Sequence, residues 1–250
     1  MTTITDKVVA NLRARGFKVQ TRDQWGSKQE RVYAYRRLQK PAKIPADTVF
    51  QHITVTLDTG PLSGDFANDV RTVERIGYER FKSGISYNWV VDMATGEIAV
   101  GQPLDAKGTH TVNDKGVAGF SYDQNYWARA IAVLGMEKSV LSKKAAESIA
   151  AIQAAMMEEG AITKTYDYVP HSLVAYKDCP CDSTRSQMSA IRKRAFEMLK
   201  QPQKETKPKK SRGQHIDAAI KHLKKAKKKG KRAKKVRSAL ESLWSIKPIK

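Results

Sequence analysis

The stretch His171-Ser-Leu-Val-Ala-Tyr-Lys177-Asp-Cys179-Pro-Cys181 brings an imidazole, an ammonium group and a thiol together within nine residues. A second histidine, His52, lies far upstream in Val49-Phe-Gln-His52-Ile-Thr54. Two imidazoles and one thiolate form a three-ligand zinc site with an open fourth position, an arrangement used for catalysis rather than for scaffolding. The pattern therefore predicts a zinc site at His52, His171 and Cys179, and a zinc-dependent hydrolase.

The two cysteines, Cys179 and Cys181, are separated only by Pro180. They are too close in sequence for an ordinary disulfide to close a useful loop. In a reducing compartment, cysteines grouped with histidine more often serve metal binding or catalysis. Two alternatives stay open, namely a polar loop with two idle thiols, and a Cys181 that competes for zinc or fills its open position. We expect a bystander role for Cys181, because the proline directs the two side chains apart.

Length and composition allow one large domain, or one domain with an appendage, in 250 residues. The apolar content of 40% is sufficient for a core, and no apolar run is long enough to predict a transmembrane helix. The N-terminus lacks a basic patch followed by an apolar stretch, so no secretory signal peptide is predicted. We expect the protein to mature in the cytoplasm.

Charge is distributed unevenly along the chain. Residues 201–250 contain 18 Lys and Arg against 3 Asp and Glu, whereas residues 1–200 contain 28 against 22, so the net charges are +15 and +6. This pattern predicts a mildly basic body and a strongly basic tail. Such a tail binds polyanions, which include nucleic acid, anionic lipid and acidic wall polymers.

The apolar pattern predicts strands that alternate with helices. The expected strands are 48–56, 85–92, 97–100 and 128–134, and the expected helices are 5–15, 68–82, 142–159 and 184–200. Thr184-x-x-Gln187 resembles a capping box at the start of the last helix, and Ala94-Thr95-Gly96 is a hairpin signal. Residues 57–66, 101–127 and 161–182 are expected to be loops. The predicted fold class is α/β, with a central mixed β-sheet flanked by helices.

Domain boundaries follow from these elements and from the charge distribution. We expect an N-terminal helical extension (1–21), a catalytic domain (22–200), a linker (201–213) and a basic helical tail (214–250). The tail is expected to contain two short helices that are separated near Gly230. Its apolar residues form interrupted stripes flanked by lysine, a pattern typical of helices that bind at an interface.

Over roughly residues 22–200, the order and spacing of several motifs resemble the zinc-dependent N-acetylmuramoyl-L-alanine amidases, the family of phage lysozyme-type amidases and peptidoglycan recognition proteins. The resemblance rests on the two histidine-bearing motifs and on the following four segments: Ser86-Tyr-Asn-Trp-Val-Val91, Thr95-Gly-Glu-Ile98, Gly108-Thr-His-Thr-Val-Asn113 and Ala130-Ile-Ala-Val-Leu-Gly135. Two positions depart from the family pattern. Ile53 stands where many members have histidine, and Cys181 stands where a glycine is usual.

The resemblance implies a role for each candidate site residue. His52, His171 and Cys179 would hold Zn²⁺, which activates a water molecule for attack on the amide between N-acetylmuramic acid and L-alanine. Lys177 would stabilise the oxyanion, and Tyr87 would orient the water or help to move its proton. The segment with His110 and Asn113 would bind substrate. The alternatives are a solvated Lys177, a half-buried strand tyrosine at Tyr87 and an ordinary surface-loop histidine at His110.

The implied function is that of a phage endolysin that hydrolyses peptidoglycan and lyses the host. We expect a monomer that stays in the host cytoplasm and acts on the wall only after release, which the resemblance implies to be through a holin-type pore. The tail would then bind an anionic wall polymer or the membrane surface. Three other functions stay open. They are a host recycling or autolytic amidase of the same family, a peptidoglycan-binding module that does not cut, and a nucleic-acid-binding protein that acts through the tail.

Overall fold

Six strands form one mixed sheet in the order β1-β4-β3-β5-β2-β6. They span β1 (Val19–Gln20), β2 (Ala46–Thr54), β3 (Trp89–Asp92), β4 (Ile98–Val100), β5 (Ala128–Leu134) and β6 (Ile162–Pro170). Only β3 and β4 pair antiparallel, and the other neighbours are parallel. The computed structural model describes residues 2–28, 41–54, 62–81, 83–136 and 138–201. In this part of the chain, no helix combines the length and the apolar character needed to cross a membrane.

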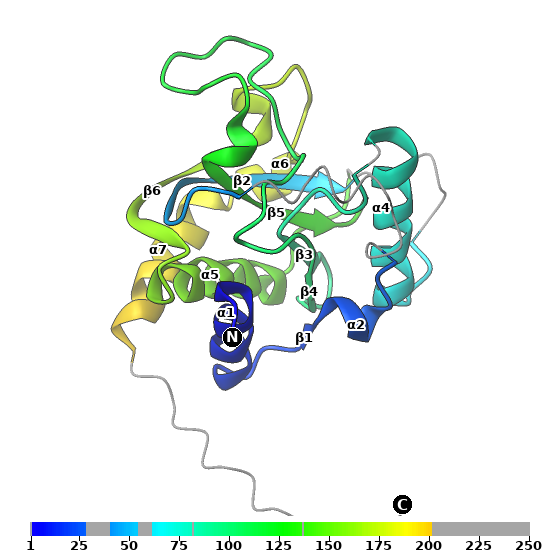
Figure 1. Ribbon diagram of the computed structural model, residues 1–250. Helices are drawn as coiled ribbons and strands as arrows, with labels where there is room; N and C mark the ends of the chain where they lie inside the picture. Colours follow the sequence, from blue (N-terminus) through cyan, green and yellow to red (C-terminus); the bar gives the residue numbers. More distant parts are fainter. Residues whose placement is uncertain (1, 29–40, 55–61, 82, 137, 202–250) are drawn as a thin grey trace, which may run out of the picture. The chain divides into compact units, whose positions relative to one another are not determined.

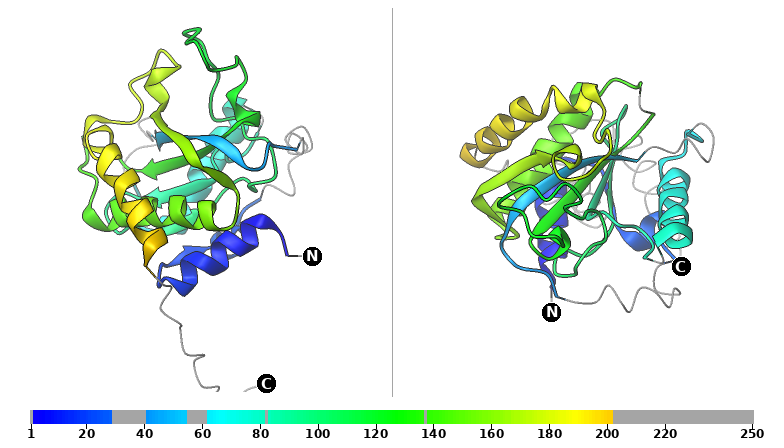
Figure 2. Two further views of the ribbon diagram at one scale, coloured as in Figure 1. Left: turned by 90° about the vertical axis from the view of Figure 1, so that its left-hand side faces the viewer. Right: turned by 90° about the horizontal axis from the view of Figure 1, so that it is seen from above.

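The helices cover both faces of the sheet (Figures 1 and 2). They span α1 (Ile4–Ala14), α2 (Arg22–Trp25), α4 (Phe66–Phe81), α5 (Lys143–Glu158), α6 (Asp182–Arg185) and α7 (Met188–Lys200). One core cluster joins the sheet to α1, α5 and α7, and a second joins it to α2 and α4. The predicted α/β class with a central mixed sheet and flanking helices is therefore confirmed.

Strands β2 and β5 lie inside the sheet, each with a neighbouring strand on both sides. Every side chain of β5 is buried, and its limits are those predicted from the apolar run before Gly135. β2 and β5 are paired in register from Thr48↔Ala128 to Thr54↔Leu134. Strands buried on both faces are typical of a parallel sheet covered by helices. This pairing fixes His52 in the middle of the molecule.

Helix α5 is anchored at its N-terminus against the β3–β4 turn. Ser142 caps the helix by accepting a hydrogen bond from the Ala145 amide. Ser148 donates a hydrogen bond of 2.6 Å to the carbonyl of Gly96. Gly96 has a φ of 75°, and a Cβ at this position would lie 2.7 Å from the backbone of Lys144. The predicted turn therefore requires glycine both for its backbone angle and for the close approach of α5.

The N-terminal helix packs into the core. Val8 and Leu12 of α1 are fully buried, and Val19 of β1 pairs with Ile98 of β4. Residues 1–204 form one compact unit, and residues 205–250 form a second unit, which lies outside the described residues together with the predicted basic tail and most of the linker. The predicted extension (1–21) therefore shares its core with the domain that follows it.

Three local predictions are wrong. The strand predicted at 85–92 begins only at Trp89, so Tyr87 lies in the bend before β3 and not in a strand. Residues 162–170 form strand β6, although 161–182 was predicted to be a loop. β6 is an edge strand whose outward positions are polar, so it lacks the apolar run that reveals a central strand. Thr184 also does not cap a long helix, because α6 begins earlier and a break separates it from α7. The Gln187 side chain instead donates hydrogen bonds to the carbonyls of Leu141 and Ser183.

Candidate metal centre

His52 projects from β2 on the face of the sheet opposite α5. Val49 and Ile53 pack in the α5 core, so the alternating residues Phe50 and His52 point to the other face. Only 1% of the His52 surface is exposed. The predicted strand 48–56 is observed as Ala46–Thr54, and residues 55 and 56 lie outside the described residues. The imidazole is thus held in the buried interior of the fold.

His171 reaches the same place from β6. Pro170, the last residue of β6, pairs with Gln51 of β2, and the 3₁₀ turn η4 (His171–Leu173) follows directly. Because parallel strands end at the same edge of a sheet, His171 lies beside His52. The ring centroids of the two histidines are 4.4 Å apart.

Cys179 completes the group from the turn after η4. Its Sγ lies 3.8 Å from Nδ1 of His52 and 3.4 Å from the amide nitrogen of Ile53, which donates to it. The Ser172 amide donates to the carbonyl of Cys179 at 2.6 Å, and the Arg185 guanidinium donates to the carbonyl of Pro180 at 2.8 Å. These contacts hold the backbone of the turn, and the held backbone places the thiol of Cys179 beside His52.

The three groups fit a metal ion. The candidate ligand atoms of His52, His171 and Cys179 all lie within 4.8 Å of one another. Tetrahedral zinc with two nitrogen ligands and one sulfur ligand requires separations of roughly 3.3–3.8 Å between ligand atoms. Nε2 of His52 is also buried without a hydrogen-bond partner among the described residues. A buried polar nitrogen without a partner is costly, so a further ligand beside this ring would lower that cost.

Burial keeps this cluster uncharged. Desolvation, together with the neighbouring His171, holds the pKa of His52 well below its usual value. Burial and the charge of Lys177 lower the pKa of His171 to about 4. Burial raises the pKa of Cys179 to about 11. At neutral pH both imidazoles are therefore unprotonated, as metal ligation requires, and a metal ion would displace one proton, from the thiol.

Tyr87 and His110 border the cluster. The ring centroid of Tyr87 lies 5.1 Å from that of His52, and His110 meets His52 edge-on at 5.4 Å. Burial raises the pKa of Tyr87, so its phenol stays protonated and can donate a hydrogen bond. Burial lowers the pKa of His110 to about 3. Both ring nitrogens of His110 are buried, and neither has a hydrogen-bond partner of acceptable geometry among the residues that the structure describes.

Lys177 is exposed at the edge of the cluster. Its charge lowers the pKa values of both His52 and His171, which shows that the ammonium group lies within electrostatic range of the two imidazoles. The arrangement therefore combines three candidate metal ligands, a protonated phenol and an exposed cation at one place.

Cys181 is directed away from the cluster. Its Sγ contacts the hydroxyls of Ser183 and Thr184, each at 3.5 Å, and 2% of its surface is exposed. It does not belong to the group of candidate ligands among the described residues. This position agrees with the expected bystander role.

Asn113 braces its own loop. Its amide nitrogen donates to the carbonyls of Val117 and Phe120, and its oxygen accepts from the Val117 amide. Both of its N–H groups are occupied, so a contact between Asn113 and a substrate stays a prediction. The sequence analysis missed Asn125, whose oxygen accepts from the amides of His110 (2.6 Å) and Thr111 (3.1 Å). The available signal was an Asx turn, since Asp123 precedes Asn125 by two residues.

Solved structures share this architecture. Drosophila peptidoglycan recognition protein SA matches 69% of this chain and 91% of its own, with 20% identity and a TM-score of 0.55. The chain has the fold of the peptidoglycan recognition proteins. Apis mellifera PGRP-SA matches at 17% identity and a TM-score of 0.56 over 94% of its chain, and Drosophila PGRP-LB at 17% and 0.55 over 93%. Each covers 69% of this chain. Comparison of the sequence with protein-family models and with curated proteins finds no match.

Proposed function

We propose that this protein is a zinc-dependent amidase that hydrolyses the bond between N-acetylmuramic acid and L-alanine in peptidoglycan. The observation that carries the proposal is the convergence of His52, His171 and Cys179, from three separate segments, into one buried group of candidate ligands. The fold adds support, because its solved examples are named for the recognition of peptidoglycan. Two histidines and one cysteine also leave a fourth coordination position for reaction.

The side chains around the proposed ion have separate tasks. When bound, Zn²⁺ would supply a Lewis acid that polarises the amide carbonyl and makes hydroxide available near neutral pH. The Ile53 amide donates to the Cys179 sulfur and so favours its thiolate form. Tyr87, which burial keeps protonated, can donate a hydrogen bond and would not serve as a base. It would orient the reacting groups beside His52.

Lys177 is proposed to stabilise the developing oxyanion. Its amine is exposed, yet its charge acts on His52 and His171, so it can reach the reacting carbonyl from the solvent side. One such donor contributes about 3–4 kcal/mol to the stabilisation of a tetrahedral transition state. His110 is neutral at physiological pH and would contact the substrate beside His52.

The biological setting is part of the proposal. We infer a phage endolysin that acts as a monomer and accumulates in the host cytoplasm before it reaches the wall. The net charge of +15 in residues 201–250 would hold it on anionic wall polymers or on the membrane surface. Binding of the same tail to nucleic acid is the competing outcome, and salt-sensitive binding to walls, vesicles and DNA alike would indicate generic electrostatics only.

The decisive experiment uses purified cell walls and full-length protein with a measured zinc content. The proposal predicts one zinc per chain and release of new L-alanine N-termini, and it predicts that Cys179→Ala abolishes both. Binding of walls by zinc-loaded protein without any release of N-termini would contradict an amidase and indicate a non-catalytic peptidoglycan-binding module.

A further inference from the structure

A pair of exposed aromatic rings lies where strand β5 begins. The side chains of Tyr126 and Trp127 are each 39% exposed, and their rings meet edge to face with centroids 4.9 Å apart. The ammonium group of Lys43 lies 4.7 Å from the centroid of the Trp127 ring. Lys43 in turn forms an ion pair of 2.7 Å with Asp47. These four residues are called the aromatic platform.

The platform is held rigidly by backbone contacts. The Lys43 amide donates to the carbonyl of Tyr126 at 2.9 Å, and the Asp47 amide donates to the carbonyl of Trp127 at 3.4 Å. The buried guanidinium of Arg129 donates to the carbonyl of Lys43 from below. Exposed rings on a fixed backbone lose little conformational entropy when a ligand covers them, which favours binding. None of these contacts takes part in the proposed chemistry.

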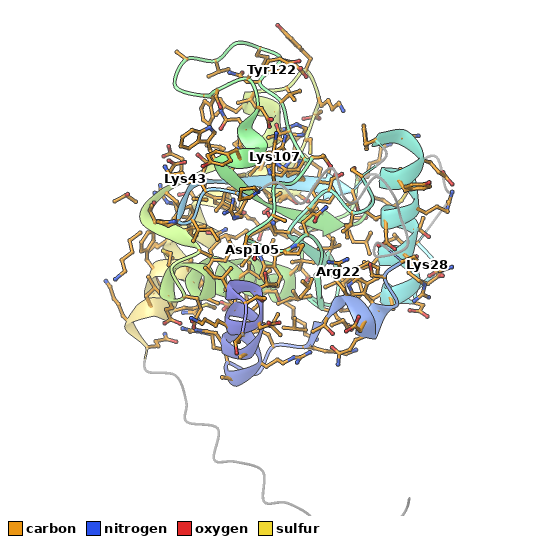
Figure 3. All side chains as sticks on the ribbon, viewed as in Figure 1. Arg22, Lys28, Lys43, Asp105, Lys107 and Tyr122 are labelled. Carbon is orange, nitrogen blue, oxygen red and sulfur yellow. The ribbon has the colours of Figure 1, made fainter. Side chains whose placement is uncertain are left out.

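Asn125 links the platform to the candidate metal centre. It directly precedes Tyr126, and its side chain is hydrogen-bonded to the backbone of His110 and Thr111 on both the donor and the acceptor side. His110 meets His52 in the cluster. A ligand on the platform would therefore be close to the chain segment that borders the proposed reaction site. Figure 3 shows Tyr122, which is 71% exposed on the same loop, at the top of the view, with Lys107 and Lys43 below it.

The charges around the rings select the class of ligand. Lys43 is paired with Asp47, and Lys107 is paired with Asp123, so the two amines and two carboxylates sum to zero. A site for nucleic acid or for an anionic membrane needs an excess of positive charge. A neutral surface of aromatic faces and flanking polar groups instead suits sugar rings, whose C–H faces stack on aromatic rings and whose hydroxyl and amide groups bond with carboxylates and amines.

We propose that the aromatic platform binds the N-acetylated sugar rings of the glycan strand, outside the metal centre. The inference rests on the proposed function and extends it, since the enzyme would hold its substrate through the polysaccharide as well as through the bond that it cuts. Trp127 supplies the stacking face, Tyr126 forms the wall beside it, and Asp47 accepts hydrogen bonds from the sugar.

The test measures the binding of a neutral probe, chitohexaose, to full-length zinc-loaded protein by calorimetry. About 0.5 M sodium chloride screens the basic tail. We expect saturable binding that weakens at least tenfold in Trp127→Ala and in Tyr126→Ala and is largely kept in Trp127→Phe. Phe81→Ala removes a ring that is 58% exposed on α4 and should leave binding unchanged. Thermal unfolding of each variant separates loss of binding from loss of folding.

Three outcomes would overturn the proposal. The wild type could show no saturable binding of chitohexaose, or the wild type and both alanine variants could bind it equally. In the third outcome, the alanine variants bind a single-stranded oligonucleotide more weakly than the wild type does, while their binding of chitohexaose is unchanged.

Hydrolysis of a short, soluble muramoyl peptide separates this proposal from the amidase proposal. Trp127→Ala should keep that activity and lose activity on intact walls. If the wild type binds the sugar but cuts no substrate, the amidase proposal fails and the glycan-binding platform stands.

Discussion

The sulfur of Cys179 lies 3.8 Å from Nδ1 of His52, although 127 residues separate them in the chain. Two features of the fold produce this contact. The parallel pairing of β2 with β6 brings the end of β6 to His52, and the braced turn after His171 directs the thiol toward it. The cluster is therefore a property of the tertiary structure, and each ligand can be tested separately.

Removal of one candidate ligand should abolish metal retention. We expect one zinc per chain in the wild type and a value near zero in Cys179→Ala, because two imidazoles alone do not complete the site. Cys181→Ala is the matched control, since this second thiol contacts Ser183 and Thr184 instead of the cluster. Metal content after dialysis gives the answer, and zinc loss in both variants would show that Cys181 is a ligand.

Lys177→Ala should keep zinc and lose turnover. If the ammonium group stabilises the oxyanion, kcat falls by about 10²–10³ with little change in KM. Lys177→Arg should recover part of the rate because it restores the charge. Lys143→Ala removes an exposed lysine from the start of α5 and serves as the control. An unchanged kcat in Lys177→Ala would show that Lys177 is a solvated surface charge without a role in the reaction.

Acid should destabilise the metal-free protein through its buried histidines. The pKa of His110 is about 3 when folded, because of burial and the charges of His171 and Arg129, and 6.5 is its ordinary value. Between these values the unfolded state binds the extra proton, so stability falls as the pH falls, by up to about 1.4 kcal/mol per pH unit for each such group. Above pH 6.5 this group has no effect.

Denaturant unfolding in EDTA at pH 7, 6 and 5 tests this dependence. His110→Gln should show a smaller loss of stability on acidification than the wild type, because one titrating group is gone. The same slope in both proteins would mean that His110 is protonated in the folded state.

The N-terminal helix should contribute to the stability of the whole unit. Leu12 is fully buried against the sheet and α5, so Leu12→Ala should lower the free energy of unfolding by about 2–5 kcal/mol. Lys7→Ala, on the exposed side of the same helix, should change it little. A single cooperative transition in both variants is expected, and a small effect of Leu12→Ala would make residues 1–21 a separate extension.

The sequence predicted those elements whose patterns are local. The apolar run Ala128–Leu134 was recognisable because all of its residues are buried, and the helix after Ser142 was recognisable because its apolar residues recur at helical spacing behind a capping serine. β6 was missed because one side of an edge strand faces solvent and its pattern resembles that of a loop. Local patterns therefore revealed central strands more readily than edge strands.

The same reasoning separates the parts of the site. His52, His171 and Cys179 were selected by residue type and order, and the fold brings them together. The side chain that braces the His110 segment could not be selected in this way. Asn113 and Asn125 are equally polar neighbours of one loop, and only the folded path of the chain determines that Asn125 reaches the His110 amide.

Asn125→Ala should therefore be more harmful than its position in a loop suggests. The change leaves the buried amides of His110 and Thr111 without their acceptor, and a buried unsatisfied group costs about 1–3 kcal/mol. We expect lower stability together with weaker hydrolysis, since the segment beside His52 loses its anchor. Asn68→Ala, at an exposed position in α4, is the control for removal of an amide side chain. Denaturant unfolding and wall hydrolysis measure the two effects, and equal stability of the two variants would contradict the bracing role of Asn125.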